Sequence, residues 1–189
     1  QNYSTFYKMI IPLMEENKMT SYNESNQQTN FLLITGLPGA GKSTLVNNLR
    51  GLTLNLDPYG VKSGDLWVTN LDALDDELKS IRLGSTVIVE GTSDNLPGVV
   101  TSLKLFGEVS VFLLDATNDE LRRAWTNRCK DGKNLFSKEF CRMANFDSIE
   151  MLDWRQQWEE KILKHMQYKR LIRSTAKRHL INVLQRLKG

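Results

Sequence analysis

One stretch, FLLITGLPGAGKSTLVNNL at residues 31–49, constrains the fold of this chain more than any other. An apolar run at residues 31–35 leads into a glycine-rich loop at residues 36–43, and residues 44–49 have a helical pattern. The loop fits G-x-x-x-x-G-K-[ST], and a strand, such a loop and a helix in this order are the context in which that motif binds phosphate. The sequence therefore predicts a cradle for a nucleoside triphosphate rather than a chance glycine-rich turn.

The residue types in this loop suit a triphosphate. Glycines let the backbone bend so that successive N–H groups point inward around a β-phosphate, and the start of the helix adds positive potential. Lys42 would place a cation on the β- and γ-phosphates, and the Ser43 hydroxyl would ligate Mg²⁺. The predicted nucleotide-binding residues are Gly36, Leu37, Pro38, Gly39, Ala40, Gly41, Lys42, Ser43 and Thr44.

The composition is that of an ordinary globular protein. A length of 189 residues suits one α/β domain, and a hydrophobic fraction of 40% is usual for a soluble chain. No apolar run approaches the roughly 20 residues that span a bilayer, and the N-terminus has no signal-peptide pattern. We therefore expect no membrane partner and a cytoplasmic location. In the cytoplasm, Cys129 and Cys141 are expected as free thiols, since no other potential metal ligands accompany them in the sequence.

Strand and helix patterns alternate along the chain after the glycine loop. Strands are predicted at residues 52–56, 86–89 and 109–114, and helices at residues 71–83, 97–106 and 118–129. This alternation predicts a three-layer α/β fold, with a central parallel sheet between helices. Ligands of such sheets bind beyond the carboxyl ends of the strands. We therefore expect the loop at Gly36 to meet Asp57, residues 90–95 and Asp115.

The domain is expected in three segments. Residues 1–30 are typical of a helix followed by a polar linker, residues 31–146 form the core with its lid, and residues 147–189 form a helical, basic extension of the same domain. Trp154 and Trp158 are interpreted as core packing rather than as a platform for stacked bases.

The C-terminal segment is strongly basic. From residue 161 onwards it has nine lysines and arginines and no acidic residue. Such a block is typical either of a surface that contacts phosphates or of a solvated helix face. The first interpretation points to nucleic acid as a partner.

Several features favour a small kinase over other P-loop proteins. The chain is short, it lacks the Asn-Lys-x-Asp segment with which GTPases recognise guanine, and it places arginines on a helix after Asp115. Residues 31–132 resemble the P-loop kinase superfamily and, within it, the polynucleotide kinase-like branch. In that branch the strand after the P-loop ends in an aspartate that activates the acceptor hydroxyl, and Asp57 matches that position. A carboxylate that only caps the turn before Pro58 is the alternative, with Asp65 as the reserve base.

The resemblance extends to VIVEGTSDN at residues 87–95. It implies that Glu90 holds Mg²⁺ with Ser43, directly or through water, although Gly91 stands where the branch often has aspartate. It also implies that Thr92 and Asn95 bind substrate; capping of the following helix is the alternative for both.

A third similar segment is VFLLDATNDELRR at residues 111–123, with its continuation to Arg128. The resemblance implies an arginine lid, in which Arg123 or Arg128 stabilises the transition state. Ordinary surface charge is the alternative for these arginines and for Arg122. Asp115 is interpreted as the anchor of a turn rather than as a metal ligand.

Together these features imply an ATP-dependent kinase that phosphorylates a hydroxyl group, most readily on nucleic acid, with Mg²⁺ as its metal. The pattern is also similar to that of bacteriophage 5-hydroxymethyluracil DNA kinases, which implies DNA modification in the host cytoplasm. A nucleoside or nucleoside monophosphate kinase is one alternative, and a nucleotide-binding switch without kinase activity is another. ATP rather than GTP is the default that the resemblance gives.

Overall fold

The computed structural model of the protein describes residues 28–64, 66–131, 137–164 and 166–187. Asp65 and residues 1–27, with the predicted N-terminal helix, lie outside the described residues. The elements follow in this order: β1 (Thr29–Thr35), α2 (Lys42–Val46), β2 (Leu52–Asn55), η1 (Asp57–Tyr59), β3 (Gly60–Ser63), β4 (Leu66–Thr69), α3 (Leu71–Ser80), β5 (Thr86–Glu90), α4 (Leu96–Phe106), β6 (Gly107–Asp115), α5 (Asn118–Asp131), α6 (Ser137–Ala144), α7 (Ser148–Leu163), β7 (Lys169–Ile172) and α8 (Arg173–Arg186).

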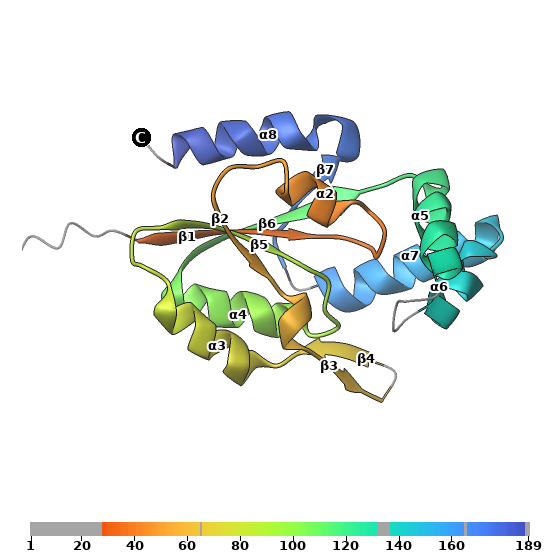
Figure 1. Ribbon diagram of the computed structural model, residues 1–189, viewed down its shortest axis with the longest axis horizontal. Helices are drawn as coiled ribbons and strands as arrows, with labels where there is room; N and C mark the ends of the chain where they lie inside the picture. The colour runs from red at the N-terminus through yellow and green to blue at the C-terminus, as the bar shows by residue number, and fades with distance from the viewer. Residues whose placement is uncertain (1–27, 65, 132–136, 165, 188–189) are drawn as a thin grey trace, which may run out of the picture.

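The centre of the molecule is a five-stranded parallel sheet in the order β2-β5-β1-β6-β7. β1 lies in the middle and pairs with β5 on one side and β6 on the other, so that Ile34 is opposite both Glu90 and Phe112. Helices cover both faces of the sheet (Figure 1), which explains why its central strands are continuous apolar runs. The predicted three-layer α/β fold is confirmed.

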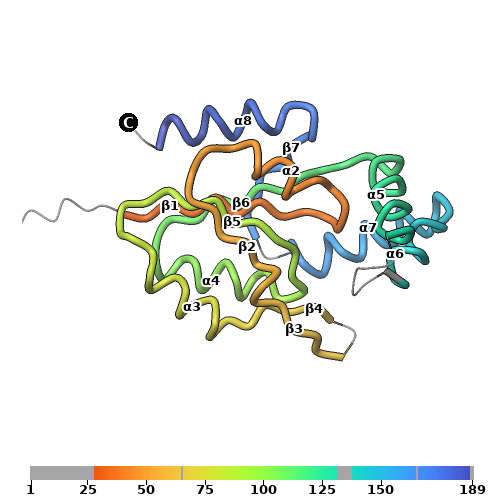
Figure 2. The backbone as a smooth tube through the Cα atoms, in the orientation of Figure 1, coloured from red at the N-terminus to blue at the C-terminus, as the bar shows by residue number. Residues whose placement is uncertain are grey.

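Alternate residues of β1 point into two separate cores. Leu32 and Ile34 face α2, α5, α6 and α8, whereas Phe31 and Leu33 face α3 and α4. Figure 2 shows α8 above the sheet, α3 and α4 below it, and α5 and α6 beyond one end of its strands. Trp154 of α7 packs edge-on against the fully buried Trp125, with ring centroids 5.3 Å apart. This agrees with the interpretation of Trp154 as a core residue.

The C-terminal segment is more closely built into the sheet than expected. Residues 169–172 form β7, the fifth strand, where only Leu171 is buried. The prediction of a helical extension at residues 147–189 did not include this strand, which lies between α7 and α8. Four residues, two of them charged and exposed, give too short a pattern to be recognised as an edge strand. The antiparallel hairpin β3–β4 was missed for a similar reason, because most of β3 is exposed.

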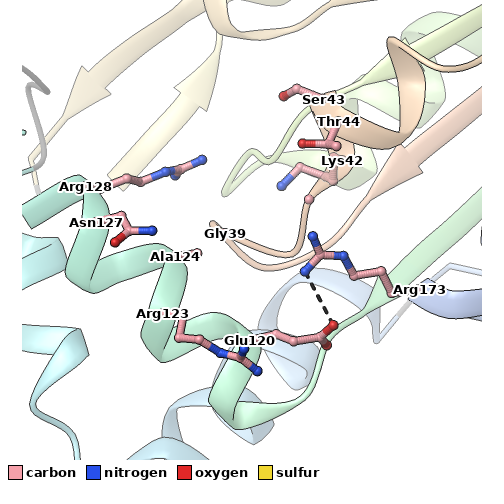
Figure 3. A pocket seen from close by; sticks show the side chains of 11 residues that line it. Gly39, Lys42, Ser43, Thr44, Glu120, Arg123, Ala124, Asn127, Arg128 and Arg173 are labelled. Carbon is pink, nitrogen blue, oxygen red and sulfur yellow. Dashed lines mark hydrogen bonds and ion pairs between the residues drawn. The ribbon is translucent and has the colours of Figure 1, made fainter.

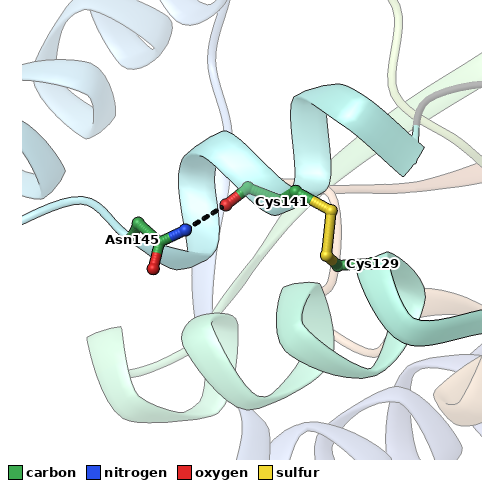
Figure 4. Close-up of a disulfide and its surroundings, with 3 residues drawn as sticks. All are labelled: Cys129, Cys141 and Asn145. Atoms are coloured by element: carbon green, nitrogen blue, oxygen red, sulfur yellow. Dashed lines mark hydrogen bonds between the residues drawn. A yellow bond between two sulfur atoms is a disulfide. The ribbon is translucent and has the colours of Figure 1, made fainter.

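The two cysteines are joined in a disulfide, so the prediction of free thiols was wrong. Cys129 belongs to α5 and Cys141 to α6, and their Cα atoms lie 4.8 Å apart (Figure 4). The expectation rested on the cellular compartment alone, since the sequence did not reveal α6 or its packing against α5. Within the described segments, no helix combines the length and apolar character that crossing a bilayer requires.

Candidate nucleotide-binding site

The glycine loop lies beyond the carboxyl end of β1 and turns directly into α2. Gly41, the last loop residue before Lys42, has φ +91°, a left-handed backbone that side chains other than glycine rarely adopt. Strands β5 and β6 flank β1 and continue into connections on opposite sides of the loop. The loop therefore lies at the point where the strand order reverses, which is the usual ligand site of such sheets.

The Lys42 side chain folds back along this loop. Its Nζ donates to the carbonyl oxygens of Gly36, at 3.0 Å, and Leu37, at 3.2 Å. Burial lowers the pKa of Lys42 to about 8; the negative charge of Glu90 opposes this shift, and the positive charge of Arg128 adds to it. The ammonium group is thus poorly solvated, and additional negative charge from a bound anion would stabilise it.

Glu90 ends β5 beside this lysine. The residue is buried, its carboxylate accepts a hydrogen bond from Ser43, and its Oε2 atom has no hydrogen-bond partner among the described residues. Burial raises the pKa of Glu90, an effect that the Ser43 hydrogen bond and the Lys42 charge oppose and that Asp57 reinforces. An unpartnered buried carboxylate oxygen is costly unless a cation or a donor reaches it.

Ser43 and Glu90 together fit Mg²⁺. Both offer hard oxygen atoms, and Mg²⁺ commonly takes only one or two protein ligands while water and phosphate oxygens supply the rest. In the described part of the chain no three His, Cys, Asp or Glu side chains are grouped as a metal cage. The site thus suits a metal that arrives with phosphates better than a permanently bound one.

Asp57 lies at the start of η1, two residues beyond β2. The N–H of its neighbour Leu56 donates to the Glu90 carbonyl at 2.8 Å, which ties the turn to β5. The charge of the Asp57 carboxylate influences the pKa of both Lys42 and Glu90. No hydrogen bond in the described structure uses this carboxylate as a turn cap. The charges of Asp57, Lys42 and Glu90 therefore influence one another, while a catalytic role for Asp57 stays a prediction.

A cavity of about 530 Å³ opens between the loop and α5 (Figure 3). Four of its residues are cationic and one is acidic, so its charge suits a polyphosphate. Figure 3 shows the side chains of Lys42 and Arg128 pointing toward one another across this space. The cavity is lined by Gly39, Gly41, Lys42, Ser43, Thr44, Glu120, Arg123, Ala124, Asn127, Arg128 and Arg173.

The arginines of α5 take different positions. Arg123 and Arg128 line the cavity, and the Arg123 Nε donates to the Asp119 carbonyl at 3.3 Å. Arg122 instead donates to the Phe146 carbonyl at 2.7 Å, which fastens α5 to the segment before α7. The helix expected to carry the lid thus presents two arginines to the cavity and uses the third for packing.

Arg173 is a site residue that sequence reasoning missed. It is the first residue of α8, and a Cβ atom on Gly41 would lie 3.3 Å from its guanidinium group. It also forms a 3.4 Å ion pair with Glu120. Arg173 directly follows Ile172, the last residue of β7. Recognising β7 as a strand would therefore have placed Arg173 at the carboxyl end of a strand, as with the other candidate site residues.

Thr92 and Asn95 make bonds within the fold. The Thr92 hydroxyl donates to the Gly36 carbonyl at 2.6 Å. The Asn95 side chain accepts from the Thr69 N–H at 2.8 Å and donates to the Thr69 carbonyl at 2.9 Å, and it does not cap α4. These contacts hold β4 and the P-loop in place, while substrate binding by the two residues stays a prediction.

Asp115 at the end of β6 serves as an anchor. Its carboxylate pairs with Arg155 of α7 at 2.6 Å and with Arg170 of β7 at 3.1 Å. It also borders a second cavity, of about 520 Å³, which shares Glu120 and Arg173 with the first. The second cavity is lined by Asp115, Ala116, Thr117, Asn118, Glu120, Arg155, Ile172, Arg173 and Ser174.

Comparison with solved structures agrees with this fold. The chain is similar to one chain of the Pnkp1/Rnl/Hen1 RNA repair complex, with a TM-score of 0.51 and 15% identity over 78% of this chain and 49% of that one. The structure of APE1195 gives a TM-score of 0.44 and 14% identity over 86% and 96% of the two chains. No family model and no curated protein match the sequence.

At this level of identity the first similarity shows the fold alone. The protein therefore has a three-layer α/β fold with a P-loop, and it spans about half of the length of the chain in the RNA repair complex. The chemistry of the site has to be argued from its own residues.

Proposed function

We propose that the protein is an ATP-dependent kinase that transfers the γ-phosphoryl group to a hydroxyl group, most readily one carried by nucleic acid. The observation that supports this is the mutual electrostatic influence of three charged groups: the Lys42 ammonium, the Glu90 carboxylate with its unpartnered oxygen, and the Asp57 carboxylate. A switch that only hydrolyses or releases nucleotide needs no acceptor base, so Asp57 would be dispensable in it.

Each residue has a role in this proposal. The loop amides and Lys42 hold the β- and γ-phosphates, while Ser43 and Glu90 hold Mg²⁺. Mg²⁺, when bound, neutralises charge on the phosphate oxygens. Asp57 takes the proton of the acceptor hydroxyl while the hydroxyl oxygen forms a bond to the γ-phosphorus. The bond between the γ-phosphorus and the β-phosphate oxygen breaks at the same time, which releases ADP.

The arginines of α5 complete this arrangement. Arg123 and Arg128 face the cavity, where they balance charge that develops on the moving phosphoryl group. The second cavity adjoins the first, so a nucleotide with its phosphates on the loop extends its nucleoside there. ATP is proposed as the donor from the kinase resemblance.

The acceptor is proposed to be nucleic acid for two reasons. The resemblance to polynucleotide kinase-like proteins implies it, and the similar solved chain comes from an RNA repair complex. DNA is the proposed polymer, and the hydroxymethyl group of 5-hydroxymethyluracil in phage DNA is the acceptor of first interest.

Two observations favour the alternative of a nucleoside or nucleoside monophosphate kinase. Part of the basic C-terminal block is engaged within the fold, since Lys161, Arg170 and Arg173 form ion pairs with acidic residues. In addition, α8 packs on the face of the sheet opposite to α3 and α4, the layer against which the Asp57 turn packs (Figure 1). A small acceptor would not need this block.

Labelled phosphate transfer separates the proposals. The protein is incubated with Mg²⁺ and γ-labelled ATP, with DNA, hydroxymethylated DNA, RNA, nucleosides and mononucleotides as separate acceptors. We expect label on a polymer, abolished in Lys42→Ala. Label on mononucleotides alone would support the alternative acceptor, and phosphate release without any labelled acceptor would contradict the kinase proposal.

A further inference from the structure

The ion pair between Glu120 and Arg173 lies where the two cavities meet. Both residues line both cavities, and they come from different helices: Glu120 from the first turn of α5 and Arg173 from the start of α8. Figure 3 shows the pair beside the glycine loop, with the Arg173 guanidinium group turned toward Glu120. A ligand that occupies both cavities must pass this pair.

The pair is loose. The Arg173 Nη1 and Glu120 Oε1 atoms are 3.4 Å apart, and the side chains of Arg173 and Glu120 are 44% and 29% exposed. The pair therefore contributes little to stability. Arg173 has no other ion pair or hydrogen bond within the described structure. A phosphate offers a guanidinium group two parallel, charge-assisted hydrogen bonds, which are stronger than this single contact.

Glu120 has a second set of partners that does not depend on Arg173. Its Oε2 atom accepts from the Thr117 N–H at 2.8 Å and from the Thr117 hydroxyl at 3.2 Å. The backbone hydrogen bond from Thr117 is the main cause that lowers the pKa of Glu120, and the charges of Arg173 and Arg123 add to it. The carboxylate therefore stays ionised and held when Arg173 moves away.

The position of Arg173 indicates which phosphate it reaches. Its guanidinium group packs against Gly41, the residue before Lys42, on the side that leads to the second cavity. With the β- and γ-phosphates on the loop and the nucleoside in the second cavity, the α-phosphate lies at the junction between them.

We infer that Arg173 binds the α-phosphate of the nucleotide and that Glu120 competes with this phosphate for the Arg173 guanidinium group. The inference rests on the proposed function, because it assumes a nucleotide that spans both cavities. In the free protein Glu120 neutralises Arg173, and on binding the guanidinium group exchanges a carboxylate oxygen for phosphate oxygens. Glu120 thereby weakens nucleotide binding.

Displacement of a fluorescent ATP analogue tests this inference. Dissociation constants for ATP, ADP, AMP and pyrophosphate are measured for wild type, Arg173→Gln, Glu120→Gln and Arg178→Gln. Arg178 is exposed on the same helix and lines neither cavity, so it is the matched control. Thermal unfolding of each variant checks that it folds.

For Arg173→Gln we expect ATP, ADP and AMP to bind roughly tenfold to a hundredfold more weakly, the usual worth of a charge-assisted hydrogen bond. Pyrophosphate, which needs only the loop, should change by less than about twofold. Glu120→Gln should bind AMP several-fold more tightly, and Arg178→Gln should match wild type.

Equal losses for AMP and pyrophosphate in Arg173→Gln would overturn the assignment to the α-phosphate, as would unchanged binding of all four. Weaker AMP binding in Glu120→Gln would overturn the competition. Lys42→Ala separates this inference from the proposed function. A wild type that binds no nucleotide refutes both, whereas binding that needs Lys42 but not Arg173 refutes the inference alone.

Discussion

The guanidinium carbon of Arg128 lies 4.9 Å from the centre of the Phe140 ring. Arg128 belongs to α5 and Phe140 to α6, and the next residue of each helix, Cys129 and Cys141, takes part in the disulfide. The cation–π contact and the disulfide therefore join α5 and α6 at adjacent positions. Because Arg128 lines the phosphate cavity, α6 supports a cavity residue without reaching the cavity itself.

Replacing the ring tests this support. A cation over an aromatic face is worth about 0.5–1 kcal/mol, so Phe140→Leu should lower kcat of the labelled-transfer reaction about twofold to fivefold. The KM for ATP should change less than kcat if Arg128 acts mainly on the transition state. Met143→Leu, a substitution of similar volume on the same buried face of α6, is the control and should keep its kcat. An unchanged kcat in Phe140→Leu would show that Arg128 is held by other contacts.

The disulfide should contribute to stability through the unfolded chain. It closes a short loop, with 12 residues of sequence separation, for which loop-closure entropy gives about 3 kcal/mol. Urea unfolding of the oxidised protein should therefore show a free energy of unfolding larger by up to about this amount than that of the reduced protein. The double variant Cys129→Ser with Cys141→Ser should match the reduced protein and no longer respond to reductant. Identical curves with and without reductant would contradict the prediction.

Nucleotide affinity should depend on pH through Lys42. Burial lowers the pKa of its amine to about 8 in the free protein, and the phosphates of a bound nucleotide raise it again. Binding therefore takes up a proton above pH 8, and affinity for ATP should fall about tenfold between pH 7 and pH 9. Calorimetry in buffers of different ionisation enthalpy measures this uptake. In Lys42→Arg, which stays charged throughout, the affinity should be flat across this range; a slope equal to that of wild type would assign the proton to another group.

Glu90 should show opposite effects on stability and activity. Burial raises its pKa in the folded protein, so the folded state loses stability as pH rises from the unfolded pKa through the folded one. Glu90→Gln lacks this ionisation. Its free energy of unfolding relative to wild type should rise between pH 4.5 and 7, by an amount of order 1 kcal/mol. Mg²⁺-dependent transfer should meanwhile fall about a hundredfold. Urea titrations at the two pH values, with transfer assays alongside, measure both effects. A stability difference from wild type that does not rise between the two pH values would refute the first.

Much of the fold was predictable because its signals are local. The apolar runs at β1, β5 and β6 each depend on neighbouring residues. These elements fixed the parallel sheet and its strand ends. The places of Asp57, Glu90 and the P-loop at or just beyond strand ends could therefore be predicted, while their catalytic roles stay predictions.

The features that were missed depend on contacts between distant segments. β7 is short and mostly exposed, and it is a strand because β6 offers a free edge. Arg173 was missed along with it. The disulfide depends on the packing of α6 against α5, and the bonds of Asn95 depend on Thr69 in the hairpin. Sequence patterns report the periodicity of one element and carry no information about which element lies beside it.

The most direct test of the proposed chemistry is Asp57→Asn. The substitution keeps the size of the side chain and removes the carboxylate that accepts the hydroxyl proton, so transfer to every acceptor should fall about a hundredfold to ten-thousandfold. ATP affinity should be retained within a few-fold, since the Asp57 carboxylate has a smaller effect on the pKa of Lys42 than Glu90 and Arg128 have, and it does not line the phosphate cavity. Binding and transfer are measured on the same preparation, with Asp94→Asn as the matched control. Asp94 pairs with Lys161 and lies outside the proposed machinery, so its loss should leave the rate per folded molecule unchanged. Transfer retained in Asp57→Asn would move the base to another residue, whereas loss of both transfer and ATP binding would mean that Asp57 serves the nucleotide rather than the acceptor.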